Sequence, residues 1–128
     1  MLLLAASLTG CEPPIRGVTR EGRVTRVPSR GLVEAAIRGT PGVDSVQDLS
    51  RLPPHRDSSE YVGYIYWGRD GARAIVQFGR TPVRDSVYFS HAISDAGTGD
   101  PSQAAVDATL PLMRAVEARL ESVPGWRA

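Results

Sequence analysis

Apolar and polar residues alternate along three runs in the middle of the chain, which is the pattern of antiparallel β-strands. The runs cover residues 61–67, 73–78 and 87–93. Gly68-Arg69-Asp70-Gly71 joins the first two and contains the Asp-Gly pair typical of hairpin turns. A weaker pattern over 43–49 indicates a further edge strand. The sequence therefore predicts an antiparallel sheet of three to four strands.

Helical spacing of apolar residues appears on both sides of these strands. A first short helix is expected to start at Ser29, its candidate N-cap, and to end at Gly39, which Pro41 follows. The second is expected to open at Asp100-Pro101-Ser102-Gln103, with the aspartate as N-cap. Its apolar residues recur every three or four positions: Val106, Leu110, Met113, Val116, Leu120 and Val123. The prediction is a single two-layer α+β domain over 29–128, in the order α-β-β-β-β-α, with both helices on one sheet face.

Aromatic residues occur on both faces of the run 61–67. Alternation puts Tyr64 and Tyr66 on one face and Trp67 on the other. Helices on one side leave the other face bare, and rigid amphipathic rings suit glycan or protein partners. We therefore take Tyr64, Tyr66, Trp67 and Tyr88 as a candidate binding surface, with ordinary cross-strand packing as the alternative.

Charge is distributed unevenly along the chain. All 15 cationic side chains are arginine and the formal net charge is only +1, which gives no reason to expect nucleic-acid binding. Between residues 16 and 30, however, five arginines accompany one acid, Glu21. We assign residues 11–28 to a basic linker that anionic lipid headgroups could attract, or that merely stays solvated.

The first eleven residues form an uncharged apolar run that ends at small residues and the only cysteine. Leu8-Thr9-Gly10-Cys11 resembles the lipobox of bacterial lipoproteins. The resemblance implies a signal peptide over 1–10, cleavage between Gly10 and Cys11, a diacylglycerol on the Cys11 thiol and a further acyl chain such as palmitate on the new amine. The basic residues that normally precede such a run are missing, which suggests a start codon further upstream.

The same resemblance predicts a location and one partner. The lipid on Cys11 would hold the protein to a membrane of the bacterial cell envelope. Glu12 follows the cysteine, whereas inner-membrane retention mainly uses aspartate there, so the outer membrane is favoured, with the domain facing the periplasm.

Residues that could carry chemistry are few. His91 lies in Ser90-His91-Ala92-Ile93-Ser94-Asp95, which holds the residue types of a hydrolase triad, but the chain has no G-x-S-x-G turn. Alternation groups His91 with Phe89 and Ile93, as expected of a hydrogen-bonded core histidine. His55 lacks the spacing of a metal site, and Cys11 would be consumed by lipid. We therefore predict no catalytic residues, no metal and no cofactor.

Three functions remain open on these grounds. The first is a lipid-anchored, non-enzymatic module that binds an envelope protein or peptidoglycan. The second is an inhibitor or immunity-type lipoprotein, and the third is a small envelope hydrolase that uses His91.

Overall fold

The protein folds as five strands and two helices in the computed structural model, which describes residues 19–51, 60–80, 87–94 and 101–124. The elements are β2 (Thr19–Val24), α1 (Arg30–Arg38), β3 (Ser45–Asp48), β4 (Tyr61–Trp67), β5 (Arg73–Arg80), β6 (Val87–Ile93) and α2 (Gln103–Leu120). There are also two short 3-10 turns: η2 (Leu49–Arg51) directly follows β3, and η3 (Arg69–Gly71) lies between β4 and β5. The predicted α+β class is confirmed.

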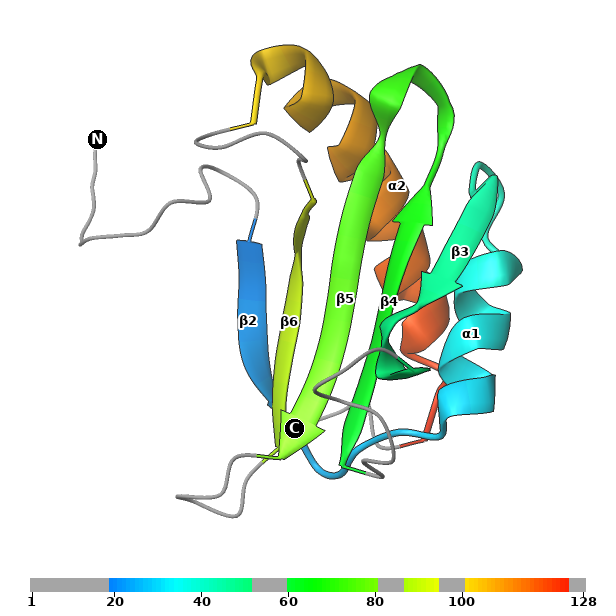
Figure 1. Cartoon of the computed structure of the whole chain (residues 1–128), viewed down its shortest axis with the longest axis vertical. Helices are drawn as coiled ribbons and strands as arrows, with labels where there is room; N and C mark the ends of the chain where they lie inside the picture. The colour runs from blue at the N-terminus through cyan, green and yellow to red at the C-terminus, as the bar shows by residue number, and fades with distance from the viewer. Residues whose placement is uncertain (1–18, 52–59, 81–86, 95–100, 125–128) are drawn as a thin grey trace, which may run out of the picture.

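The strands form one antiparallel sheet in the order β2-β6-β5-β4-β3 (Figure 1). The pair Trp67 and Arg73 closes the β4–β5 hairpin register. Asp70 and Gly71 in its turn both have positive φ, of 58° and 81°. The sequence-predicted hairpin, its Asp-Gly turn and the third strand thus appear as expected.

The strand β2 corrects the predicted strand count and the predicted linker. Glu21-Gly22, interpreted as a possible turn, continues straight through β2 and pairs with Ser90 and Phe89 of β6. The element order is therefore β-α-β-β-β-β-α, and residues 19–24 of the predicted 11–28 linker belong to the sheet. A short isolated hairpin is marginal, whereas pairing with an existing strand satisfies the backbone groups, and polar side chains suit an edge.

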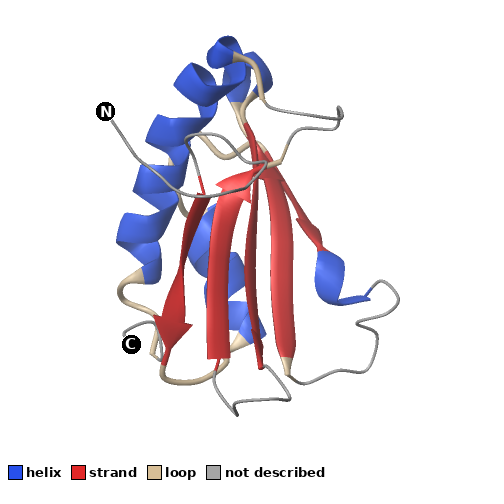
Figure 2. Cartoon of the chain, turned by 90° about the vertical axis from the view of Figure 1, so that its left-hand side faces the viewer, coloured by secondary structure: helices blue, strands red, loops and turns tan. Residues whose placement is uncertain are grey.

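Both helices pack against the same face of the sheet, and Figure 2, seen from the β2 edge, shows α2 running along it. Helix α1 begins after Ser29, whose side chain makes no capping bond. Helix α2 begins at Gln103, later than predicted, and its N-cap is Ser102, whose Oγ accepts the N–H of Ala105 at 3.1 Å. Asp100, the predicted N-cap, lies outside the described residues.

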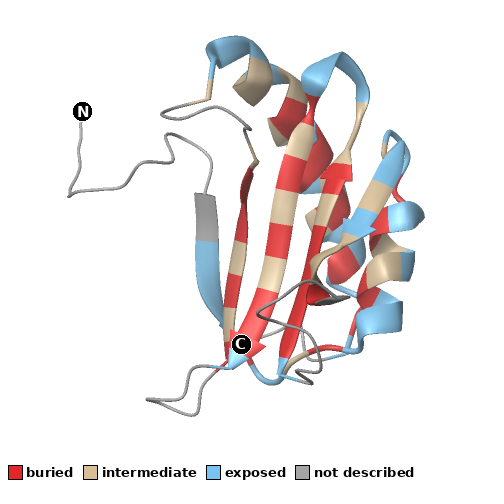
Figure 3. Cartoon of the chain, viewed as in Figure 1, coloured by how far each residue is buried: buried red, intermediate tan, exposed pale blue. Residues whose placement is uncertain are grey.

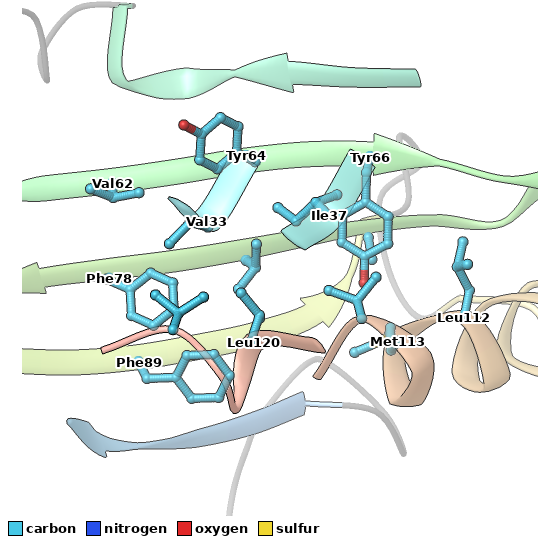
Figure 4. Close-up of a cluster of buried hydrophobic side chains, with 14 of the residues drawn as sticks. Val33, Ile37, Val62, Tyr64, Tyr66, Phe78, Phe89, Leu112, Met113 and Leu120 are labelled. Carbon is cyan, nitrogen blue, oxygen red and sulfur yellow. The ribbon is translucent and has the colours of Figure 1, made fainter. Parts of the chain in front are cut away.

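The hydrophobic core fills the space between the sheet and the helices (Figure 4). Helix α1 contributes Val33 and Ile37, both fully buried, whereas Leu32 of the same helix is 48% exposed. Helix α2 buries Met113, Val116 and Leu120 as predicted. The sheet contributes a row of core residues from the helix side: Val24, Val62, Tyr64, Tyr66, Ala74, Val76, Phe78, Val87, Phe89 and Ile93.

Candidate functional site

The sheet face turned away from α1 and α2 is the candidate site. Neither α1 nor α2 covers it, and it faces the viewer in Figure 3, where buried and partly exposed residues alternate along β5. We call it the uncovered face. It is made by alternate residues of β4, β5 and β6: Tyr61, Gly63, Ile65, Trp67, Arg73, Ile75, Gln77, Gly79, Tyr88, Ser90 and Ala92.

The four aromatic residues of the predicted binding surface divide between the two faces. Tyr64 and Tyr66 have no exposed surface, and the Tyr64 hydroxyl donates to the backbone oxygen of Arg30 in α1 at 3.0 Å. Both are therefore core residues that cannot meet a partner in this fold. Trp67 and Tyr88 lie on the uncovered face and are partly exposed.

Two tyrosine rings fill the space above two glycines at one end of the uncovered face. An added Cβ on Gly79 would stand 2.5 Å from the Tyr88 ring, and one on Gly63 would collide with the Tyr61 ring. The Tyr61 hydroxyl donates to Oε1 of Gln77 at 2.7 Å. Burial is the main cause that raises the pKa of Tyr61 to about 12, with Tyr88 as a second cause. At this end of the face the two tyrosine rings therefore occupy the space that side chains on Gly63 and Gly79 would take.

An apolar row and a cationic corner make up the rest of the uncovered face. Ile65 pairs with Ile75 across β4 and β5, and Ile75 pairs with Ala92 of β6. Next to them, Cζ of Arg73 lies 5.7 Å from the centre of the Trp67 ring, within the range of a cation–π contact. Nε of Arg73 is buried and has no hydrogen-bond partner. The face thus combines apolar surface, aromatic rings and a partly exposed arginine.

A chain of hydrogen bonds crosses the core on the helix side. The Tyr66 hydroxyl lies 2.5 Å from Nε2 of His91, and Nδ1 of His91 lies 2.7 Å from Oε2 of Glu117 in α2. A neutral imidazole with its proton on Nδ1 satisfies every partner, since Tyr66 donates to Nε2 and Glu117 accepts from Nδ1. Burial, followed by the charge of Glu117, raises the pKa of Tyr66. The network holds α2 to the sheet.

The network has the residue types of a catalytic relay but not the access that catalysis needs. Tyr66 and His91 are completely buried, and only Glu117 keeps some exposure, at 18% of its side chain. Both ring nitrogens of His91 are engaged, so neither can take a proton from a substrate in this arrangement. His91 is the hydrogen-bonded core histidine that alternation indicates.

A hollow of about 280 Å³ lies where α2 meets η3 and the turn before β3. Its lining is mostly apolar and includes two charged residues: Pro41, Gly42, Arg69, Asp70, Ala72, Ala108, Pro111, Leu112 and Ala115. It contains no residue of the Tyr66–His91–Glu117 network. We assign it no chemistry.

The remaining expectations concern metal sites, membrane-spanning helices and the lipobox-like residues. Over the ranges that the structure describes, His, Cys, Asp and Glu form no cluster of three or more suited to a metal ion. In the same ranges no helix has the length and apolarity needed to cross a bilayer. Gly10, Cys11 and His55 lie outside the described residues.

Known proteins give no relative from which a role could be transferred. The chain matches no protein-family model, and comparisons with curated proteins and with solved structures found no match.

Proposed function

We propose that the chain is a lipid-anchored protein of the bacterial cell envelope that binds an envelope component through its uncovered face. The observation that carries the proposal is the partly exposed apolar and aromatic surface of that face, which includes Ile65, Trp67, Ile75 and Tyr88. The anchor rests on the lipobox-like Leu8-Thr9-Gly10-Cys11.

The composition of the uncovered face supports binding. An antiparallel sheet that faces water on one side normally carries polar residues there. Here the centre of the open face is the row Ile65–Ile75–Ala92, bordered by Trp67 and Tyr88. Contiguous apolar surface with aromatic residues at its margin is typical of interaction sites.

The anchor supports the same function from the sequence side. Two or three acyl chains on one residue make release from a bilayer slow, because each buried methylene contributes about 0.8 kcal/mol. A protein held this way meets partners in the envelope, and we favour the outer membrane with the domain facing the periplasm. The hydrolase alternative has less support, since His91 has no access to a substrate in the folded domain.

A binding experiment tests the proposed surface. The whole chain, purified from membranes in detergent, is titrated with isolated cell envelopes, together with the variant Trp67→Ala/Tyr88→Ala. The control is Leu32→Ala, which removes an exposed apolar side chain from α1, away from the uncovered face. We expect saturable binding that the double variant loses and the control keeps. Equal binding by all three chains would refute the proposed surface.

A labelling experiment tests the anchor. Cells that produce the wild-type chain or Cys11→Ser are grown with labelled palmitate. Label should enter the wild type only, and the variant should leave the detergent phase. Label in both chains, or a mature protein that still begins with Met1, would remove the anchor from the proposal.

A further inference from the structure

We propose that the partner of the uncovered face is a sugar polymer that carries carboxylates, the chemistry of peptidoglycan, and that Arg73 on Trp67 binds a carboxylate. This inference rests on the proposed function, because it names the ligand of the same face. The proposed ligand of the uncovered face is a glycan rather than a protein.

The first step is the unsatisfied donor of Arg73. Its Nε is buried without a hydrogen-bond partner, so the folded protein already bears the cost of desolvating a charged group. A carboxylate that accepts from two guanidinium N–H groups at once matches the planar fork of this side chain. Arg73 is partly exposed, so such a ligand could reach it while the guanidinium stays beside the Trp67 ring.

The second step is the ring beside that donor. Cζ of Arg73 lies 5.7 Å from the centre of the Trp67 ring. An indole that is partly exposed beside a cation presents an apolar platform next to a charge. Sugar rings have apolar faces that pack on such a platform, while the carboxylates of the peptide stems attached to them need a donor alongside. Trp67 and Arg73 are cross-strand neighbours, so the register of β4 and β5 holds the aromatic ring and the cationic group next to each other.

The third step is the relief of the face. Protein partners typically gain most of their affinity from side chains that enter pockets. At the end of the uncovered face that holds Tyr61 and Tyr88, the rings occupy the spaces above Gly63 and Gly79 that could otherwise form such pockets. The result is a flat surface, which suits a ligand that lies along it.

The fourth step is length and charge. Tyr61 and Trp67 are six residue steps apart on β4, a distance of roughly 20 Å along the strand. An extended polymer can follow the strands over this length, whereas a single small molecule cannot. The charged side chains that alternation places on this face, among the residues with described side chains, are Arg73 and Arg23 against Glu21. The excess is positive, as an acidic ligand requires.

The experiment uses the whole chain in detergent and isolated peptidoglycan freed of bound protein, with binding measured by co-sedimentation. Three chains are compared: wild type, Arg73→Gln and the control Arg114→Gln, which changes an exposed arginine of α2. We expect Arg73→Gln to weaken binding about tenfold or more, as loss of a bond to a charged group implies, and Arg114→Gln to bind like the wild type. Arg73→Lys should recover only part of the affinity.

A second arm varies the ligand. Peptidoglycan whose carboxylates have been converted to amides should bind the wild type about as weakly as native peptidoglycan binds Arg73→Gln, and chitin, an uncharged sugar polymer, should bind weakly too. Urea unfolding midpoints verify that each variant is folded. Equal binding of native and amidated peptidoglycan, or equal effects of the two glutamine variants, would overturn the proposal.

The outcomes separate this inference from the proposed function. If the wild type ignores peptidoglycan while Trp67→Ala/Tyr88→Ala still abolishes binding to envelopes, the glycan is wrong and a protein partner remains. If the double variant binds envelopes like the wild type, the uncovered face itself is wrong.

Discussion

The ring of Tyr88 occupies the position that a side chain on Gly79 would take. The two residues are direct partners across β5 and β6, and a Cβ on Gly79 would stand 2.5 Å from Cε1 of the ring. Tyr61 lies on the other side of Gly79, as its partner in β4. The glycine therefore allows aromatic rings to lie close to the sheet, and its replacement should be costly.

Gly79→Ala should lower the free energy of unfolding by about 1–2 kcal/mol, because the methyl group must displace the Tyr88 ring. Gly22→Ala is the matched control in β2, where an added Cβ meets nothing within 4 Å. It should change stability little, or raise it by up to about 1 kcal/mol by restricting the unfolded chain. Urea denaturation measures both. In a Tyr88→Ala background the cost of Gly79→Ala should shrink, and an unchanged cost would contradict the contact.

Tyr66→Phe should lower the free energy of unfolding by about 1–3 kcal/mol, since it leaves Nε2 of His91 buried without a donor. Tyr88→Phe removes the same hydroxyl from a partly exposed ring and should cost no more than about 0.5 kcal/mol. Tyr66→Phe and Glu117→Gln act through the same imidazole, so their effects should not add. Strict additivity in a double-mutant cycle would argue against a connected network.

Gly71→Ala and Gly31→Ala should change stability in opposite directions. Gly71 has φ +81°, so alanine there is strained although space is open, and we expect a loss of about 1–2 kcal/mol. Gly31 lies inside α1 with nothing near its missing Cβ, so alanine should add about 0.5–1 kcal/mol. Thermal unfolding measures the two shifts, and shifts of the same sign would contradict the backbone assignment.

Stability should fall between pH 10 and about 12. Burial raises the pKa of Tyr61 from 10.0 to about 12 in the folded protein, and it also raises the pKa of Tyr64, Tyr66 and Tyr88. In this window the unfolded chain releases phenolic protons that the folded chain retains, so the free energy of unfolding decreases as pH rises. The stabilising contribution is fully present below pH 10.

Urea unfolding at several alkaline pH values checks this prediction, with tyrosinate absorbance as a parallel readout. Tyr61→Phe should make the fall shallower, because one group with a raised pKa has gone. Tyrosines that titrate at pH 10 in the folded protein would show that burial does not raise their pKa.

Local sequence signals located most of the sheet but could not establish all of its pairings. The three central strands were predicted because alternation and the Asp-Gly turn are local patterns. The strand β2 was not, because its polar sequence becomes a strand only through pairing with β6, more than 60 residues away. The start of α2 was misplaced because Asp100 and Ser102 are both good N-caps, and hydrogen bonding at Ser102 decides between them.

Of the four aromatic residues predicted for the binding surface, Trp67 and Tyr88 lie on the uncovered face, whereas Tyr64 and Tyr66 lie in the core. Alternation separates Tyr64 and Tyr66 from Trp67, so the candidate set combined residues from opposite faces, and only the positions of the helices decide which face is covered. Arg73 was not part of the predicted surface, and its pairing with Trp67 comes from the register of the β4–β5 hairpin. Its unsatisfied Nε, in contrast, depends on packing around the side chain and has no sequence signal.

Because β2 starts at Thr19, a lipid on Cys11 would hold the folded domain close to the membrane surface. Eight residue steps separate Cys11 from Thr19, and an extended chain of that length spans about 28 Å at most. The predicted linker to residue 28 would have allowed roughly twice that reach. The protein could then search only a thin layer above its bilayer, so any partner must itself come within that layer.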